Sequence, residues 1–426
     1  MTPAGLYVHV PYCVRRCSYC TFVLTTDFSS RDRYLEALRR EAELVAPEAG
    51  GAGFDSLYLG GGTPSTVPPN LLAALLADLR AAFEFEDGSE ITIEANPDDV
   101  TDAAAAAWRE AGATRVSLGV QSFRDEELRA IDRIHTGEDA ARAIDRLASA
   151  GLAMSADLMI GIPGQERGGL LADVSRLAAG PAGHVSIYIL ELDKAKRIAE
   201  DRRLHPGRYL TDDAQADAYL DAGRLLRDAG FRHDEVSNWS RPGSTARHNA
   251  KYWRRVPTLG LGVGAHELWD ERRRANTASL GAYLDAIAHG RRPTVADRAI
   301  DDVEREREEI LLAARTREGI PAERIESWLA ERGDAALRED WPRWIDAGLI
   351  ERRGERYALT ERGFLVSNEI LFRFVWRSFC FENGRVAPHL SPNQDSRSAH
   401  ARHRDGFLTR QRSTSLSPPE ISSSSF

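Results

Sequence analysis

Short apolar runs alternate with amphipathic segments along the first half of the chain. The apolar runs read as buried strands and occupy residues 6–10, 54–59, 91–95, 115–120, 153–160 and 184–190. Segments with helical periodicity lie between them, at residues 30–45, 70–83, 101–112, 124–131 and 138–149, and one more helix is expected before the sixth strand. Ser29 or Ser30 is expected to cap the first helix, and Thr101 the third. This alternation predicts an α/β fold with a parallel sheet, either open or closed into a barrel.

The pattern changes after about residue 300. Helical periodicity at residues 306–314, 325–329 and 341–347 is followed by a hairpin pattern at 349–359. Helices followed by a hairpin predict a small α+β domain that resembles a winged helix. From about residue 376 the chain loses its periodicity and becomes rich in Ser, Arg and Pro, which is typical of disorder. The predicted parts are a core, a linker with a candidate binding motif, the small domain and a disordered tail, at residues 1–240, 241–300, 301–375 and 376–426.

Length and charge restrict the classes of protein that fit. With 426 residues, 42% of them hydrophobic, the chain is long enough for one barrel-sized domain and a smaller one. No run approaches the roughly 18–20 apolar residues of a membrane span. A net charge of −9 argues against non-specific nucleic-acid binding, and the acidic helices of the small domain argue against a DNA-binding regulator. Reduced thiols and no recognisable targeting segment predict a cytoplasmic protein.

Three of the four cysteines lie in one stretch directly after the first predicted strand. Cys13, Cys17 and Cys20 have the spacing C-x3-C-x2-C, and Pro11 ends the strand because it has no backbone donor. Three thiols cannot all pair with one another, and nothing in the sequence indicates an oxidising compartment. A metal site is therefore the better interpretation of this cysteine loop.

The fourth ligand decides which metal fits. A structural zinc site needs four protein ligands, which would add His9 from the strand or the distant Cys380. A cubane iron–sulfur cluster normally takes four cysteines, and with three it keeps one iron open for a small molecule. The cysteine spacing, with the aromatic Tyr19 before the last cysteine, resembles the signature of radical S-adenosylmethionine (SAM) enzymes. We therefore favour a three-cysteine cluster over zinc.

Other unusual residues fall at the ends of the predicted strands. Three glycines, residues 60–62, follow the second strand, and Glu94, Gln121 and Asp157 belong to the next three. Because parallel strands end at one edge of a sheet, these residues are expected on one rim, where α/β folds build their sites. Alone, the glycines would indicate only a tight turn, and Glu94, Asp157 and Arg133 only salt bridges. Together they offer acceptors for hydroxyl groups and a cation for a carboxylate.

Six motifs together resemble one known family. Within about residues 5–265, in the order and spacing of the radical SAM coproporphyrinogen-oxidase-like family, stand YVHVPYCVRRCSYCTF, LYLGGGTPS, ITIEANPDD, VSLGVQSF, DRIHTG and ADLMIGIPGQ. The chain is most similar to the haem chaperone branch of that family. Phe22 stands where the family's oxidases have a further cysteine, and their long segment before the first motif is missing here. HNAKYW, at residues 248–253, matches a motif of the chaperone branch.

The resemblance implies a partial (β/α)6 barrel related to the TIM fold, with a [4Fe–4S] cluster on Cys13, Cys17 and Cys20. It implies a SAM pocket lined by Tyr7, Gly62, Thr63, Glu94, Gln121, Arg133 and Asp157. It also implicates His248 in haem binding, since an imidazole can ligate haem iron and Tyr252 and Trp253 offer flat apolar faces. The alternative is that HNAKYW is a loop that packs two aromatic rings, with His248 as a hydrogen-bonding residue.

The function implied by the resemblance is a haem chaperone that binds a cluster, SAM and haem and delivers haem to acceptor proteins. The alternative is an oxygen-independent coproporphyrinogen III oxidase, which would use SAM radicals to decarboxylate propionates. SAM cleavage, and with it enzyme activity, is left open, as are a homodimer and a peripheral encounter with a membrane through the acceptors. No nucleic-acid partner is expected. Two positions depart from the family pattern: residues 191–197 lack the expected proline-containing sequence, and Glu267 replaces a small residue.

Overall fold

The computed structural model describes residues 2–191, 196–331, 333 and 335–373. The chain forms two compact units, one spanning Met1–Gly319 and the other beginning at Ile320. The predicted disordered tail and Cys380 lie outside the described residues.

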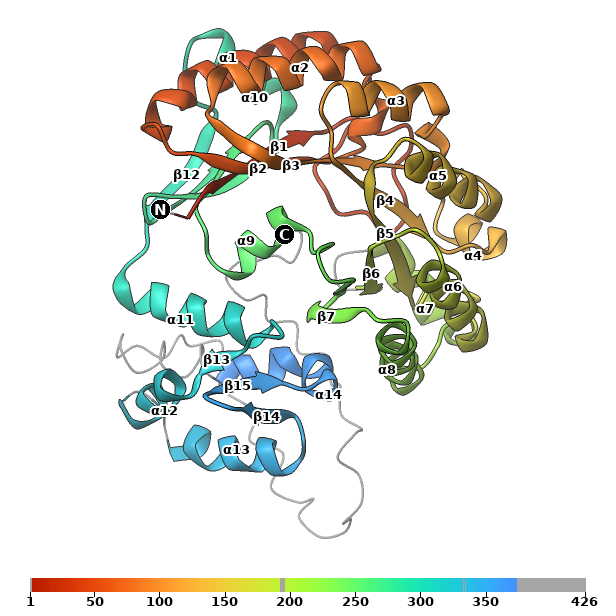
Figure 1. The fold of residues 1–426 in the computed structure, drawn as a ribbon, viewed down its shortest axis with the longest axis vertical. Coiled ribbons are helices and arrows are strands. Elements are labelled where there is room, and N and C mark those ends of the chain that lie inside the picture. Colours follow the sequence, from red (N-terminus) through yellow and green to blue (C-terminus); the bar gives the residue numbers. More distant parts are fainter. Residues whose placement is uncertain (1, 192–195, 332, 334, 374–426) are drawn as a thin grey trace. The chain divides into compact units, whose positions relative to one another are not determined.

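The first unit is built on one twelve-stranded sheet, in the order β12-β11-β10-β9-β1-β2-β3-β4-β5-β6-β8-β7. Its centre consists of six parallel strands: β1 (Ala4–Val10), β2 (Phe54–Gly61), β3 (Phe85–Ala95), β4 (Arg115–Gln121), β5 (Ala153–Ile160) and β6 (His184–Ile189). Figure 1 shows these strands following an arc. The order ends in two edges, β12 and β7, so the strands form a partial barrel. The predicted α/β class with a parallel sheet is confirmed.

Helices cover the outer side of the arc (Figure 1): α1 (Arg31–Ala49), α2 (Pro69–Ala82), α3 (Asp102–Glu110), α4 (Asp125–Ala130), α5 (Gly137–Ser149), α6 (Arg167–Ala179), α7 (Lys196–Leu204) and α8 (Asp212–Asp228). Thr101 caps α3 as predicted, because its side chain accepts a hydrogen bond from Ala104 N. The prediction for α1 is wrong in two details. The Ser30 side chain makes no cap and instead bonds the Tyr12 hydroxyl at 3.0 Å, and the helix continues past Val45.

The two faces of the parallel strands differ in chemistry. In β1, Leu6, Val8 and Val10 are fully buried and alternate with Tyr7 and His9. In β3, the polar residues Glu90, Thr92 and Glu94 alternate with buried isoleucines in the same way. The apolar set packs against the helices, and the polar and aromatic set faces the inside of the arc. The interior thus differs from the aliphatic interior of an ordinary TIM barrel and is suited to polar ligands.

Residues after β6 extend the sheet on both sides. The added elements are β7 (Arg232–Glu235), β8 (Asn238–Ser240), α9 (Arg247–Trp253), β9 (Thr258–Leu261), β10 (His266–Trp269), β11 (Arg272–Asn276), α10 (Leu280–Ala288), β12 (Thr294–Ala299) and α11 (Asp302–Ala314). β9 pairs in parallel with β1, so β1 lies between β2 and β9. The turn after β9 packs closely on the chain around the cysteines. A Cβ atom on Gly262 would lie 2.6 Å from His9 O, and one on Gly264 would lie 2.9 Å from Val23.

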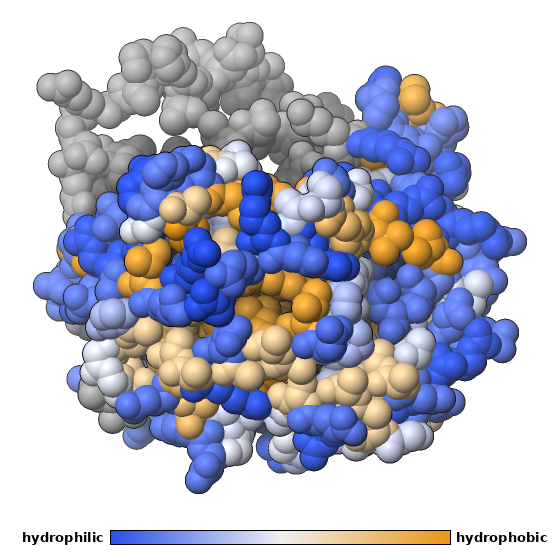
Figure 2. Space-filling view, turned by 90° about the horizontal axis from the view of Figure 1, so that it is seen from above, coloured by the Kyte–Doolittle hydropathy of each residue, from blue (hydrophilic) through white to orange (hydrophobic). Residues whose placement is uncertain are grey.

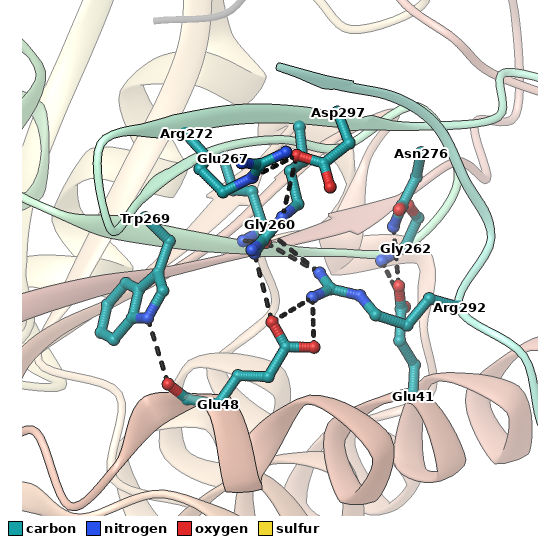
Figure 3. Close-up of polar contacts among 11 residues, drawn as sticks. Glu41, Glu48, Gly260, Gly262, Glu267, Trp269, Arg272, Asn276, Arg292 and Asp297 are labelled. Carbon is teal, nitrogen blue, oxygen red and sulfur yellow. Dashed lines mark hydrogen bonds and ion pairs between the residues drawn. The ribbon is translucent and has the colours of Figure 1, made fainter. Parts of the chain in front are cut away.

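A buried carboxylate connects α1 to this extension. Glu41 accepts hydrogen bonds from Asn276 Nδ2 at 2.6 Å and from Gly262 N at 2.7 Å (Figure 3). It also accepts one from the Tyr283 hydroxyl at 2.6 Å. Burial raises the pKa of Glu41 to about 7, although all three hydrogen bonds favour the ionised form. Glu41 therefore connects α1, α10, β11 and the end of β9.

A second carboxylate in Figure 3 is Glu267, one of the two departures from the family pattern. Its side chain is almost fully buried and pairs with Arg274 at 2.8 Å and Arg292 at 3.0 Å. Both arginines also contact Glu48 of α1. The buried charge of Glu267 is therefore balanced by the guanidinium groups of Arg274 and Arg292.

We expect Glu41→Gln to destabilise the first unit by about 1–3 kcal/mol. The glutamine side chain has one oxygen where glutamate has two, so one of the three groups that donate to Glu41 is left without an acceptor. The carboxyl pKa rises from its ordinary 4.5 to about 7 on folding, so the folded state binds the proton more tightly. Wild-type stability therefore falls as pH rises from 4.5 through 7, and the deficit of the variant shrinks over that interval. Urea denaturation at pH 6 and pH 8 measures this, with the exposed Glu43→Gln on the same helix as control. A deficit that grows with pH would contradict the assignment.

A groove of about 420 Å³ lies between α1 and α10, on the outer surface of the first unit. Ala37, Leu284 and Ile287 contribute apolar surface, and Arg33 and Arg40 stand among the polar lining residues. Figure 2 views the face that carries α1 and α2, and shows hydrophobic side chains in hollows among hydrophilic ones.

The second unit contains β13 (Ile320–Pro321), α12 (Ala322–Glu331), α13 (Ala335–Asp346), β14 (Ile350–Arg353), β15 (Arg356–Leu359) and α14 (Glu361–Leu365). The antiparallel pair β14 and β15 confirms the predicted hairpin, while the winged-helix assignment stays a prediction. Ile325, Trp328 and Leu359 belong to its buried core. Among the described residues of either unit, no helix combines the length and apolar character that crossing a membrane requires.

Candidate functional site

Hydrogen bonds between its two ends close the cysteine loop. Tyr12 and Thr25 form an isolated bridge, and Cys13 N donates to Thr25 O at 3.0 Å. The Arg16 guanidinium donates to the carbonyl groups of residues 20, 22 and 24, the shortest distance being 3.1 Å. Backbone carbonyls inside the loop are thereby satisfied by one side chain. The twelve-residue span between bridge positions is held as a compact unit at the end of β1.

Two side chains from other elements approach the cysteine sulfurs. The Thr63 hydroxyl donates to Cys13 Sγ at 3.1 Å, and Arg133 Nη1 lies 3.9 Å from Cys17 Sγ. Burial raises the pKa of Cys17 and of Cys20, and the Arg133 charge acts in the opposite direction on Cys17. A cationic group beside a thiol favours the thiolate, which is the form that binds metal.

The triple glycine packs against the backbone of the cysteine loop and hydrogen-bonds to it. Gly62 N donates to Val10 O at 2.9 Å, and Thr63 N donates to Tyr12 O at 2.8 Å. A Cβ atom on Gly62 would lie 2.7 Å from the Pro11 carbonyl carbon, closer than side chains pack. Position 62 is therefore restricted to glycine by the backbone of the cysteine loop.

His9, the nearby fourth ligand considered for a zinc site, has both ring nitrogens hydrogen-bonded to protein groups. His9 Nδ1 bonds the Tyr7 hydroxyl at 3.0 Å and Nε2 bonds Val23 O at 2.8 Å, so both ring nitrogens are engaged. Burial lowers the pKa of His9 to about 4, which keeps the ring neutral. Within the described residues, no three His, Cys, Asp or Glu side chains converge as ligands of one ion do. The thiolates of a cubane bind different irons and can stand further apart.

Glu94 and Asp157 carry perturbed carboxyl groups inside the arc. Glu94 accepts the Tyr58 hydroxyl at 2.7 Å and Gly61 N at 2.9 Å. Burial raises the pKa of Glu94 to about 7 and that of Asp157 to about 6, and the charge of Asp157 adds to the rise at Glu94. Arg133 lowers the pKa of Asp157, so these three predicted rim residues do interact.

Gln121 and Arg133, both predicted for the rim, have buried polar atoms without a protein partner. Gln121 Oε1 and Arg133 Nε are buried and make no hydrogen bond. Gln121 also has φ of 66°, which is uncommon for a residue other than glycine. Unsatisfied buried atoms and strained backbone occur together at ligand sites. Together with the free thiols, these atoms fit a polar ligand beside a cysteine-bound cluster.

The HNAKYW motif lies at the other end of the strands. His248 is 1% exposed, and its imidazole bonds the Ser56 hydroxyl through Nδ1 at 3.0 Å and the Tyr252 hydroxyl through Nε2 at 2.9 Å. The ring also stands close to Gly5, at the start of β1. Burial lowers the pKa of His248 to about 3. The structure therefore separates His248 from the cysteines and buries it under the barrel.

The family of the chain follows from comparison with known proteins. The sequence profile of the Radical SAM superfamily matches residues 7–176. A Mycobacterium tuberculosis protein named heme chaperone HemW is 35% identical over 376 residues, which cover 87% of this chain and 94% of that protein. The chain belongs to the HemW family. The Lactococcus lactis HemW is 29% identical over 88% of this chain and 97% of its own length.

The fold of a solved structure agrees with that of this HemW-family chain. Coproporphyrinogen III oxidase (HemN) from Escherichia coli aligns with a TM-score of 0.75 at 22% identity, covering 87% of this chain and 90% of that one. At that identity the likeness shows the fold alone. The predicted resemblance to the radical SAM coproporphyrinogen-oxidase-like family, and to its haem chaperone branch, is confirmed.

The structure brings the predicted rim residues Glu94, Asp157 and Arg133 together, but sequence reasoning missed the residues behind them. Tyr58, Glu90 and Arg115 were not predicted, although Tyr58 holds Glu94 and Arg115 pairs with Glu90 at 3.1 Å. Polar residues recur at every second position of these apolar strands, and this alternation could have indicated that one face of each strand lines a polar interior. Of the departing stretch at residues 191–197, residues 192–195 lie outside the described part of the chain.

Proposed function

We propose that this protein is a haem chaperone that carries a [4Fe–4S] cluster, binds SAM and haem, and passes haem to acceptor proteins. The observation that carries the proposal is the 35% identity to a protein named heme chaperone HemW across nearly its whole length. The position of Phe22 supports it over the oxidase, since the oxidases of the family have a further cysteine there. Reduced thiols favour the cytoplasm, and a homodimer is compatible with the proposal.

In this proposal Cys13, Cys17 and Cys20 hold the cluster. When bound, the cluster supplies one iron without a protein ligand, at which a small molecule can bind. Thr63 and Arg133 direct a hydroxyl and a positive charge at the cysteine sulfurs, and such contacts tune a cluster's reduction potential.

The remaining rim residues receive SAM. Glu94 and Asp157 offer carboxylate oxygens to ribose hydroxyls, and the unsatisfied atoms of Gln121 and Arg133 offer an acceptor and a donor. The guanidinium of Arg133 can also balance the SAM carboxylate. Tyr7 lies beneath this layer, where its ring packs on that of Tyr58 at 6.2 Å.

His248 is the proposed haem ligand, because its motif distinguishes the chaperone branch. Ligation requires its Nε2 to leave the Tyr252 hydroxyl, since both ring nitrogens are hydrogen-bonded in the described state. His266 is the second candidate, because it is exposed at the start of β10.

The decisive experiment supplies the anaerobically reconstituted protein with coproporphyrinogen III, SAM and a reductant. We expect no protoporphyrinogen, whereas haem added to the same preparation should give a stable complex that passes haem to an apoprotein. Soret titration of His248→Ala and His266→Ala then identifies the ligand as the variant that loses affinity. Formation of protoporphyrinogen, or failure of the cluster-loaded protein to bind haem, would favour the oxidase instead.

A further inference from the structure

The HNAKYW motif and the rim meet at one side chain. Tyr58 of β2 donates its hydroxyl to Glu94 at 2.7 Å, and its ring lies 5.2 Å from the His248 imidazole at an interplanar angle of 24°. We infer that α9 forms the floor of the SAM pocket, where His248 and Tyr252 are positioning residues that hold Tyr58 and, through it, Glu94. The inference rests on the proposed binding of SAM and adds the motif to that same site.

His248 is held on three sides. Ser56 and Tyr252 bond its two ring nitrogens, and the Glu90 carboxylate accepts its backbone N–H at 2.9 Å. Glu90 also accepts Arg247 N at 3.0 Å, so it fixes the first turn of α9. Because Glu90 and Glu94 are four residues apart on β3, one strand holds both the start of α9 and the rim carboxylate.

Glu94 depends on Tyr58 for its placement. One carboxylate oxygen bonds Gly61 N and the other bonds the Tyr58 hydroxyl. A Tyr58 ring without its stacking partner would keep the hydroxyl but lose its fixed direction, and Glu94 would then be held only at Gly61. Since a ligand hydroxyl needs the carboxylate within hydrogen-bond distance, misplacement weakens binding.

The pH dependence of SAM affinity, which follows the protonation of Glu94, provides a specific test of the inference. The titratable and charged groups facing Glu94 are Tyr7 from β1, Tyr58 from β2, Asp157 from β5, Tyr188 from β6 and Tyr252 from α9. Burial raises the Glu94 pKa and donation from Tyr58 lowers it. Hydroxyl groups of a ligand donate to the ionised carboxylate, so affinity falls as pH drops through that pKa. Loss of the Tyr58 donation moves this fall to higher pH.

The test measures SAM affinity by equilibrium dialysis of the cluster-loaded, haem-free protein between pH 6 and pH 8.5. We expect His248→Ala to weaken SAM binding about fivefold to tenfold at neutral pH, which is the size of the effect of losing one ordinary hydrogen bond. Its pH midpoint should move upward in the same direction as that of Tyr58→Phe. His248→Gln, which keeps a flat hydrogen-bonding group, should restore most of the affinity, and Tyr252→Phe should give a smaller loss.

His233 provides a matched control, because it is another buried imidazole stacked on an aromatic ring, that of Trp239 at 4.1 Å. His233→Ala should leave both the affinity for SAM and its pH midpoint unchanged. The inference is overturned if His248→Ala retains four irons and wild-type SAM affinity, or if Tyr58→Phe leaves the pH midpoint in place. A wild-type protein that takes up the cluster but binds no SAM would instead overturn the proposed function. If His248→Ala does not fold, His248→Gln and Tyr252→Phe decide the role of α9, and a wild-type SAM affinity and pH midpoint in both would overturn the inference.

Discussion

Cys17→Ser is expected to remove almost all iron from the anaerobically reconstituted protein, which in the wild type should hold about four atoms per chain. The serine hydroxyl is a poor substitute for a thiolate, and two remaining cysteines leave two irons of a cubane without a protein ligand. Cys13 and Cys20, the other cysteines of the described residues, already hold irons in this assignment, so neither can take the place of Cys17. Iron analysis and the visible absorbance of the cluster measure the loss.

Cys380→Ser is the control for this experiment, because it removes a thiol that the three-cysteine assignment does not use. Its iron content and absorbance should equal those of the wild type. Equal losses from the two variants would show that the cluster has a fourth cysteine ligand. A Cys17→Ser protein with the wild-type melting temperature but no iron would confirm that the loop is closed by its own hydrogen bonds.

Arg115→Met is expected to destabilise the first unit by about 3–5 kcal/mol, because it leaves the buried Glu90 carboxylate without its cation. Arg115 Nε lies 3.1 Å from Glu90, and the guanidinium also donates to Ser155 and to the carbonyl of Ser244. Both side chains of the pair are less than 10% exposed, so solvent cannot replace the lost partner. The midpoint of urea denaturation reports the change.

Two companion variants test the cause of that loss. Glu90→Gln combined with Arg115→Met removes both charges and should recover part of the stability. Arg39→Met removes a partner from the exposed pair with Glu36 and should cost at most about 1 kcal/mol. Similar losses from Arg39→Met and Arg115→Met would show that burial does not govern the effect.

The parallel centre of the sheet was predictable because its strands are nearly continuous apolar runs with helical periodicity between them. β11 has no such signal, since it begins with the three charged residues Arg272, Arg273 and Arg274. Its arginines pair with partners distant in sequence, among them Glu308 for Arg273 and Glu48 for Arg274. A strand stabilised by tertiary ion pairs leaves no local pattern.

The rim was predictable for a related reason: strand ends share one edge, so a cysteine loop and isolated polar residues at those ends had to meet. The burial of His248 was not predictable, because α9 spans only seven residues and has no periodic pattern to show which face is covered. Its position depends on Glu90, a residue 158 positions away along the chain. Contacts of that separation are visible only in the folded structure.

β1 acquires both of its neighbours only late in protein synthesis. The strand and the cysteine loop leave the ribosome first, yet β9, which pairs with β1, ends at Leu261, and Val23 packs on the still later Gly264. At about 5–20 residues per second, ribosomes need roughly 12–50 s to make the segment between the last cluster cysteine and β9. During that time β1 has an unpaired edge and the loop lacks its supporting turn. Cluster insertion into the supported loop therefore has to wait until Gly264 has been made, and the three thiols must stay reduced until then.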